Sequence, residues 1–295
     1  MKTGYLAPEG LENALLSELK NVEQQIGRLI IASGAEQEAH WALNVWRDLQ
    51  IIPFESLGDA AKKLRALGAL WAHYPNANLR RAHLIQEKLP FFSPKPLSFP
   101  AMLPQSSLGS WTLLDANTLI ASASCTSPLP HGEFQFHETK EPPSRAYLKL
   151  WEILTRIGRW PKAGELCLEL GASPGSWSWV LSSLGAKVIA VDRAPLETPY
   201  PNVEFRKQDA FQLHPKDFPH VQWVFSDLIC YPEKLLAWIQ LWLDHGSKAH
   251  FICTLKFQGD EQYGVIAEFK KLPGVQILHL FHNKHELTMV LIQTR

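Results

Sequence analysis

Apolar residues in the second half of the chain fall into short runs separated by segments of mixed polarity. The runs that predict strands cover residues 165–170, 187–191, 203–206, 221–226, 250–255, 275–281 and 287–293. Helices are predicted from about residue 176 and over residues 233–243 and 261–272. The last two runs flank the polar residues 282–285, which suits an antiparallel hairpin. Alternation of strand and helix is typical of an α/β fold with a mostly parallel sheet and helices on both faces.

The first part of the chain has a less regular pattern. Leucines at helical spacing predict helices over residues 9–20 and 56–71, and a further helix is expected over residues 76–88. Residues 28–32 and 113–122 predict strands, the second with a turn at residues 115–117. We therefore expect a smaller α+β domain at the N-terminus.

Two proline-containing segments, residues 89–104 and 127–143, interrupt these patterns. Domain boundaries fall preferentially in such stretches. We place the boundary near residue 140, which divides the chain into residues 1–140 and 141–295.

Charge changes this interpretation only slightly. Lys plus Arg and Asp plus Glu both total 29 in 295 residues, so the formal net charge is zero. A neutral total counts mildly against a nucleic-acid partner but is compatible with a local basic patch. Basic residues of the first domain are candidates for an RNA-docking patch, although a solvated helix face is the simpler explanation: Arg65, Arg80, Arg81, Lys88 and Lys95.

The four cysteines have no C-x-x-C spacing, so we expect neither a disulfide scaffold nor a zinc site, and no metal ligand cluster stands out. The N-terminus lacks an apolar signal region, and no apolar run is long enough to span a membrane. A cytoplasmic protein without membrane contact is the simplest expectation.

The candidate chemistry begins in the loop E-L-G-A-S-P-G-S-W-S, residues 169–178, between the first strand and the helix of the second domain. It is neither a G-x-G-x-x-G motif nor a P-loop. Asp192 ends the next strand and could accept hydrogen bonds from ribose hydroxyls, with a helix or turn cap as the less favoured alternative. Asp209 follows the third strand and could accept from an adenine amino group, or lie in a surface turn. Ligands of such sheets bind at the carboxyl ends of the strands, where Asp192, Asp227 and Lys256 also fall.

This loop resembles the cofactor motif of the FtsJ/RrmJ-type ribose 2′-O-methyltransferases, with Ser176 at the position of the motif's second glycine. Residues 143–153, 224–228, 254–259 and 284–292 resemble that family's catalytic segments, in the family's order. The layout of the whole chain is most similar to the RlmM branch, which modifies a cytidine ribose of large-subunit (23S) ribosomal RNA. That branch carries an N-terminal RNA-binding extension, and the extension of about 140 residues found here is shorter.

The resemblance implies a Rossmann-like class I S-adenosylmethionine-dependent methyltransferase, with a seven-stranded sheet and S-adenosylmethionine as cofactor. It implies an RNA partner, ribosomal RNA in particular, bound in part by residues 1–140. The family's catalytic tetrad falls on Lys149, Asp227, Lys256 and Glu286. Cofactor contacts are implied for Ser144, Gly171, Ser173, Pro174, Gly175, Ser176, Trp177, Asp192, Asp209 and Asp227.

The chemistry explains why these residue types are needed. A ribose hydroxyl is a poor nucleophile, so the enzyme must align it with the methyl group and remove its proton. A lysine can serve as base only after losing its own proton, and a second lysine nearby favours that loss because like charges repel. We therefore expect Lys149 to assist Lys256, and Asp227 and Glu286 to hold the two lysines in place.

Three other functions remain open at this point. The same fold could hold cofactor and RNA without catalysis, although an intact tetrad argues against this. A base N-methyltransferase usually has an Asn-Pro-Pro-Tyr or Asp-Pro-Pro-Tyr type of loop after the fourth strand, where this chain has D-L-I-C at 227–230. A dinucleotide oxidoreductase would need a different glycine pattern. The target nucleotide and the oligomeric state are left undetermined.

Overall fold

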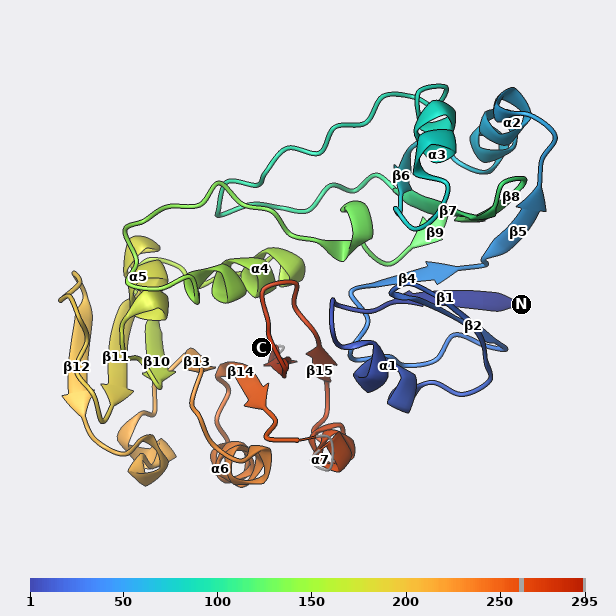
Figure 1. Ribbon diagram of the computed structural model, residues 1–295. Helices are drawn as coiled ribbons and strands as arrows, with labels where there is room; N and C mark the ends of the chain where they lie inside the picture. Colours follow the sequence, from blue (N-terminus) through green and yellow to red (C-terminus); the bar gives the residue numbers. More distant parts are fainter. Residues whose placement is uncertain (260–262, 294–295) are drawn as a thin grey trace. The chain divides into compact units, whose positions relative to one another are not determined.

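The computed structural model describes residues 1–259 and 263–293 (Figure 1). The chain forms two compact units, one of residues 1–98 and 102–136 and one of residues 99–101 and 137–295. The division at residue 136 lies close to the expected boundary at 140, and the inclusion of residues 99–101 in the second unit was not anticipated.

The first unit contains two sheets. The first has the order β2-β3-β1-β4-β9 and is antiparallel throughout, with β1 (Lys2–Leu6), β2 (Val22–Ile26), β3 (Leu29–Ser33), β4 (Asn44–Arg47) and β9 (Ser124–Cys125). The second has the order β5-β8-β7-β6, with β5 (Gln50–Pro53), β6 (Trp71–His73), β7 (Gly109–Asp115) and β8 (Thr118–Ser122). Within this second sheet, β6 and β7 pair in parallel, and the other neighbouring strands are antiparallel.

The helices of the first unit are α1 (Glu12–Glu18), α2 (Leu57–Leu67) and α3 (Leu79–Gln86), with a 3-10 turn at η1 (Pro130–Gly132). Leucine, alanine and isoleucine side chains from α2 and α3 form one apolar core with Trp71 and Trp111 of the second sheet. This burial explains the leucine spacing that predicted α2.

Several predictions for the first unit were wrong in detail. The helix expected over residues 56–71 ends at Leu67, because Gly68 takes an extended backbone and Trp71 begins β6. The strand with a turn expected over residues 113–122 is confirmed as the hairpin of β7 and β8, but β7 begins earlier, at Gly109. The sequence did not predict β1, β2, β4, β5, β6 or β9.

The second unit contains one seven-stranded sheet of order β12-β11-β10-β13-β14-β16-β15. Its strands are β10 (Leu166–Leu170), β11 (Lys187–Asp192), β12 (Val203–Lys207), β13 (Trp223–Ser226), β14 (His250–Lys256), β15 (Val275–Leu278) and β16 (Glu286–Leu291). Strand β16 is antiparallel to both of its neighbours, and the remaining neighbours pair in parallel. The expected mostly parallel sheet with a C-terminal antiparallel pair is confirmed.

The helices of this unit are α4 (Tyr147–Ile157), α5 (Ser176–Ser183), α6 (Pro232–Asp244) and α7 (Val265–Phe269), with short 3-10 helices η2 (Ala210–Gln212) and η3 (Pro215–Asp217). In Figure 1, α4 and α5 lie on one side of the sheet and α6 and α7 on the other. The helix predicted over residues 261–272 is observed as the shorter α7, and residues 261 and 262 lie outside the described residues. None of the described helices is long and apolar enough to cross a membrane.

The order of the strands in this sheet determines where the candidate site lies. The chain runs outward from β10 through β11 to β12, and then returns to the other side of β10 to form β13 and β14. The reversal opens a crevice at the carboxyl ends of β10 and β13, where ligands of such sheets bind. Buried apolar side chains such as Leu168, Val224 and Ile252 fix these strands in the core.

Candidate active site

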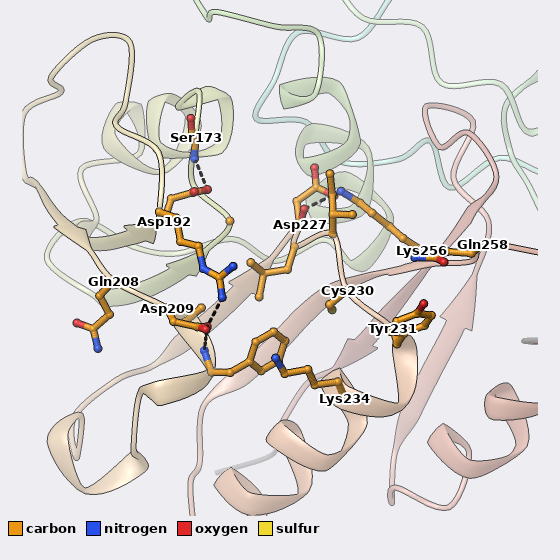
Figure 2. A pocket seen from close by; sticks show the side chains of 16 residues that line it. Ser173, Asp192, Gln208, Asp209, Asp227, Cys230, Tyr231, Lys234, Lys256 and Gln258 are labelled. Carbon is orange, nitrogen blue, oxygen red and sulfur yellow. Dashed lines mark hydrogen bonds and ion pairs between the residues drawn. The ribbon is translucent and has the colours of Figure 1, made fainter.

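A pocket of about 540 Å³ opens at the carboxyl ends of β10 to β14. This is within the size range of small-molecule sites, roughly 300–1,000 Å³. Six of the predicted residues line it, namely Gly171, Ser173, Asp192, Asp209, Asp227 and Lys256. Figure 2 shows Ser173, Asp192 and Asp209 toward one side and Lys256 toward the other, as the order of their strands requires.

Asp192, the last residue of β11, is held by the backbone around it. The Ser173 N–H donates to Asp192 Oδ2 at 3.0 Å, and the Ala194 N–H donates to Asp192 Oδ1 at 2.9 Å. A carboxylate has about four lone-pair sites, so both oxygens can still accept from hydroxyl groups. The rigid setting orients this acceptor toward the pocket that it lines.

Gly171 is required by the close approach of two loops. Its φ is +78°, and a Cβ built on it would lie 3.0 Å from Leu228 N and 3.1 Å from Leu228 Cα. Both are backbone atoms, so a side chain at this position would have to shift the main chain of Leu228. Glycine therefore lets the cofactor loop pass directly over the peptide that follows Asp227.

Asp209 caps the 3-10 helix η2 and forms the far end of the pocket. Its Oδ1 accepts from the Phe211 N–H at 3.0 Å, and its Oδ2 pairs with the exposed Arg193 guanidinium. The Phe211 amide, and then Arg193, hold the pKa of this carboxyl below its usual value. Phe211 supplies an aromatic wall, with Lys234 Nζ 3.9 Å from the centre of its ring.

Five residues predicted to contact the cofactor do not line the pocket: Ser144, Pro174, Gly175, Ser176 and Trp177. The Ser176 hydroxyl, buried in the first turn of α5, lies 2.8 Å from the Ser144 hydroxyl and donates to Ser144 O at 3.0 Å. The Trp177 indole N–H donates to Ala146 O at 2.9 Å. These contacts join the cofactor loop to the start of α4, and a direct cofactor contact for the five residues stays a prediction.

The four residues of the predicted tetrad meet at one point of this unit. Lys149 Nζ lies 3.1 and 3.0 Å from the two carboxylate oxygens of Asp227 and 3.0 Å from Glu286 Oε1. Lys256 Nζ lies 3.1 Å from Asp227 Oδ1 and donates to the Asp227 main-chain oxygen at 2.7 Å. The Asp227 carboxylate thus bridges the two lysines.

Electrostatics distinguishes the members of this cluster. Burial alone would lower the pKa of Lys149, but the carboxylates of Asp227 and Glu286 outweigh it and raise that pKa above its ordinary value. Burial alone would raise the pKa of Asp227, but Lys149 and Lys256 outweigh it and hold that pKa below its ordinary value. Lys149 and Asp227 therefore form a buried pair in which both groups are charged. Lys256 reaches the pocket surface, whereas Lys149 does not.

Glu152 fixes the relation between α4 and the segment that carries Glu286. Its side chain is fully buried and lies one helical turn after Lys149. Glu152 Oε1 accepts from the Phe281 N–H at 2.9 Å, and Oε2 accepts from the His282 N–H at 3.0 Å. Arg156 also pairs with it at 2.8 Å. The helix and the loop between β15 and β16 are thereby held in register, and Lys149 meets Glu286.

The donors and acceptors of the pocket fit S-adenosylmethionine. That molecule carries ribose hydroxyls, an adenine amino group and positive charge. Asp192, Asp209 and Asp227 offer three carboxylates at the ends of β11, β12 and β13. Phe211 and Leu228 supply apolar surface for a planar ring.

Sequence reasoning missed the pocket residues that lie on loops rather than at strand ends. The loop residues include Arg193, Gln208, Leu228, Ile229, Cys230, Tyr231 and Gln258, and two more missed residues lie in helices, Phe211 in η2 and Lys234 in α6. The available signal was an apolar segment, Leu228 to Tyr231, placed directly after Asp227 rather than inside a strand or helix. In Figure 2, Cys230, Tyr231 and Gln258 lie on the same side of the pocket as Lys256.

Fold and pocket together are those of a class I S-adenosylmethionine-dependent methyltransferase. Residues 142–262 match the model of the FtsJ-like methyltransferase family. The second unit of the chain is therefore similar to the FtsJ-like methyltransferases over most of its length.

Relatives extend the similarity over different lengths. The chain is 26% identical over 319 residues to the ribosomal RNA large subunit methyltransferase M of Laribacter hongkongensis, which covers 93% of this chain and 88% of that protein. It is 29% identical over 188 residues to the protein of that name from Alkalilimnicola ehrlichii, which covers 58% of this chain and 51% of that protein. With the protein from Halorhodospira halophila it is 34% identical over 120 residues, 39% of this chain and 35% of that protein. The match thus spans about half of the second relative and about a third of the third.

Proposed function

We propose that this protein transfers a methyl group from S-adenosylmethionine to a ribose 2′-hydroxyl of large-subunit ribosomal RNA. The observation that carries the proposal is the bridge that Asp227 forms between Lys149 and Lys256 at the edge of the pocket. The FtsJ-like domain and the relatives named ribosomal RNA large subunit methyltransferase M support the substrate class.

Lys256 is the general base in this proposal. Lys149 stays protonated, because two carboxylates surround it and its pKa is raised. Lys256 contacts only the Asp227 carboxylate of these two, and both oxygens of that carboxylate already bond to Lys149. Lys256 also lines the pocket. It is thus the lysine of the pair that can meet a substrate hydroxyl.

The cofactor, when bound, would supply an electrophilic methyl group carried on a positively charged sulfur. The Lys256 amine would accept the proton of the 2′-hydroxyl as the ribose oxygen bonds to the methyl carbon and the carbon–sulfur bond breaks, which leaves S-adenosylhomocysteine. Asp227 orients Lys256 through the 2.7 Å bond to its main-chain oxygen and the 3.1 Å contact to its carboxylate. Glu286 holds Lys149 in place at 3.0 Å, so the cluster carries no large net charge.

We assign RNA recognition in part to the first unit. Helices α2 and α3, and the turn that follows α3, expose basic side chains that could contact phosphates: Lys62, Arg65, Arg80 and Lys88. Phosphate contacts of this kind supply affinity without sequence information. A cytoplasmic place of action follows from this substrate and stays a prediction.

The test is transfer from labelled S-adenosylmethionine to ribosomal RNA isolated from cells that lack the gene, followed by alkaline hydrolysis. Alkali cleaves RNA through the 2′-hydroxyl, so a 2′-O-methyl label is recovered in alkali-stable dinucleotides. Label recovered in mononucleotides would indicate a base methyltransferase. If no RNA is labelled although the protein binds the cofactor, the chain is a binding protein of the same fold.

A further inference from the structure

An exposed apolar segment follows Asp227 directly. Among the described residues of the second unit, the large hydrophobic side chains that are exposed are Ile229, Tyr231 and Leu241, at 87%, 55% and 37%. Two of the three lie within one short loop, and both line the pocket of the candidate active site. Large apolar surface left in water is unfavourable, and its concentration at a pocket is typical of a binding surface.

The position of Tyr231 is fixed by the helix that it precedes. It caps α6, and its carbonyl accepts from the Lys234 N–H at 3.1 Å and the Leu235 N–H at 3.3 Å. Pro232 occupies the first turn, where its fixed φ suits a helix start. The ring of Tyr231 is therefore carried by an ordered backbone, a favourable setting for a surface that must receive a flat ligand.

Tyr231 lies on the Lys256 side of the pocket rather than on the side that suits the cofactor (Figure 2). The carboxylates that suit the cofactor, Asp192 and Asp209, follow β11 and β12, whereas Lys256 ends β14. Figure 2 shows Tyr231 with Lys256 and Gln258, away from Asp192 and Asp209. A ribose whose 2′-hydroxyl meets Lys256 carries its base on the adjacent carbon, so that base must lie within one nucleoside of Lys256.

The chemistry around the pair suits a nucleotide. Every base has a flat apolar face, which stacks on aromatic side chains when it is out of the helical stack. The exposed Lys234, on the first turn of α6, adds a positive charge to the same pocket, where its Nζ lies 3.9 Å from the centre of the Phe211 ring. An aromatic ring, an aliphatic side chain and flanking lysines thus match a nucleotide that has left its base pair.

We propose that Ile229 and Tyr231 form a platform that receives the unstacked base of the target nucleotide while its ribose faces Lys256. This inference rests on the proposed function and deepens it. The substrate is accordingly a nucleotide in a single-stranded or flipped-out state, and a fully paired stretch of the same sequence binds poorly at this site.

The experiment measures binding of the full chain to a short single-stranded oligoribonucleotide and to the same strand annealed into a duplex. Tyr231→Ala is expected to weaken single-strand binding by about tenfold, since stacking on an aromatic side chain contributes about 1–3 kcal/mol per base. Tyr231→Phe should bind as the unaltered protein does, because the ring is kept. Ile229→Ser should weaken binding, and Leu241→Ser, the matched exposed residue outside the pocket, should not.

Affinity for S-adenosylmethionine and the unfolding temperature are measured for every variant. The platform is overturned if Tyr231→Ala binds the single strand as tightly as the unaltered protein, or if it loses cofactor affinity to the same extent. Because binding requires no methyl transfer, failure of the proposed function is recognised separately. RNA that is methylated with an unchanged KM in Tyr231→Ala would refute the platform and leave the proposed function standing.

Discussion

Glu152 and His282 are joined twice, although they are far apart in the sequence. Glu152 Oε2 accepts from the His282 N–H at 3.0 Å and lies 2.7 Å from His282 Nδ1. One residue lies in α4, which also carries Lys149, and the other in the loop before β16, which begins with Glu286. The two parts of the tetrad that come from distant segments are thus held together by a buried anchor beside them.

Removal of this anchor should be costly. Glu152→Ala removes the buried carboxylate that pairs with Arg156 and accepts from two backbone N–H groups, and breaking a buried ion pair in this way costs about 3–5 kcal/mol. The free energy of unfolding in urea measures the loss. The matched control is Glu204→Ala, which removes an exposed pair with Arg206 and should cost about 0–1 kcal/mol. Equal effects of the two variants would show that the anchor contributes nothing.

Gly171 offers a test of the close approach between loops. Gly171→Ala forces a side chain into a left-handed backbone and against the Leu228 backbone, so it should displace the peptide after Asp227 and reduce methyl transfer. Gly164→Ala is the control, because Gly164 has φ +82° and a Cβ added to it would meet nothing within 4 Å. It should cost only the backbone strain, about 1–2 kcal/mol. Methyl transfer and urea unfolding are compared, and equal behaviour would contradict the close approach.

Glu169 should make stability depend on pH. It is fully buried in β10, Ser178 Oγ donates to it at 2.6 Å, and burial raises its pKa to about 8 from an ordinary value of 4.5. A raised pKa in the folded state means that the stability present below pH 4.5 is lost as the pH rises toward 8.

Glu169→Gln cannot ionise and keeps an oxygen that can accept from Ser178. As the pH rises from 5 to 8, the free energy of unfolding of Glu169→Gln should therefore increase relative to that of the unaltered protein. Urea unfolding at several pH values measures the difference. A difference that does not change with pH would contradict the account of this buried carboxyl.

The second unit could be predicted from the sequence because its central strands, β10, β13, β14 and β16, are buried on both faces. Runs such as residues 250–255 are then continuously apolar, and their carboxyl ends are marked by Asp192, Asp227 and Lys256. The first unit was harder to predict because its strands are short and face partly into solvent. Residues 22–25 of β2 are exposed, and β6 has three residues that continue a helical pattern.

The candidate site also has residues that the sequence could indicate and residues that it could not. Residue types at strand ends indicated Asp192, Asp227 and Lys256, but no spacing could indicate that Asp227 would bridge two lysines. Residues such as Phe211 and Tyr231 became visible only when the path of the backbone was known. Ser176, the departure from the resembled motif, proves to bond to Ser144, a contact between segments that the sequence does not place together.

The central claim is that Lys256 removes the proton from a ribose hydroxyl. Its most direct test is the rate of transfer from labelled S-adenosylmethionine to unmodified large-subunit ribosomal RNA, with the product identified as a nucleoside. Lys256→Ala is compared with Lys187→Ala, an exposed lysine at the opposite end of the strands. The account predicts a 2′-O-methyl nucleoside, formed about 10²–10⁴-fold more slowly by Lys256→Ala and at the normal rate by Lys187→Ala. A Lys256→Ala variant that keeps its rate, or a label on a base, would contradict it.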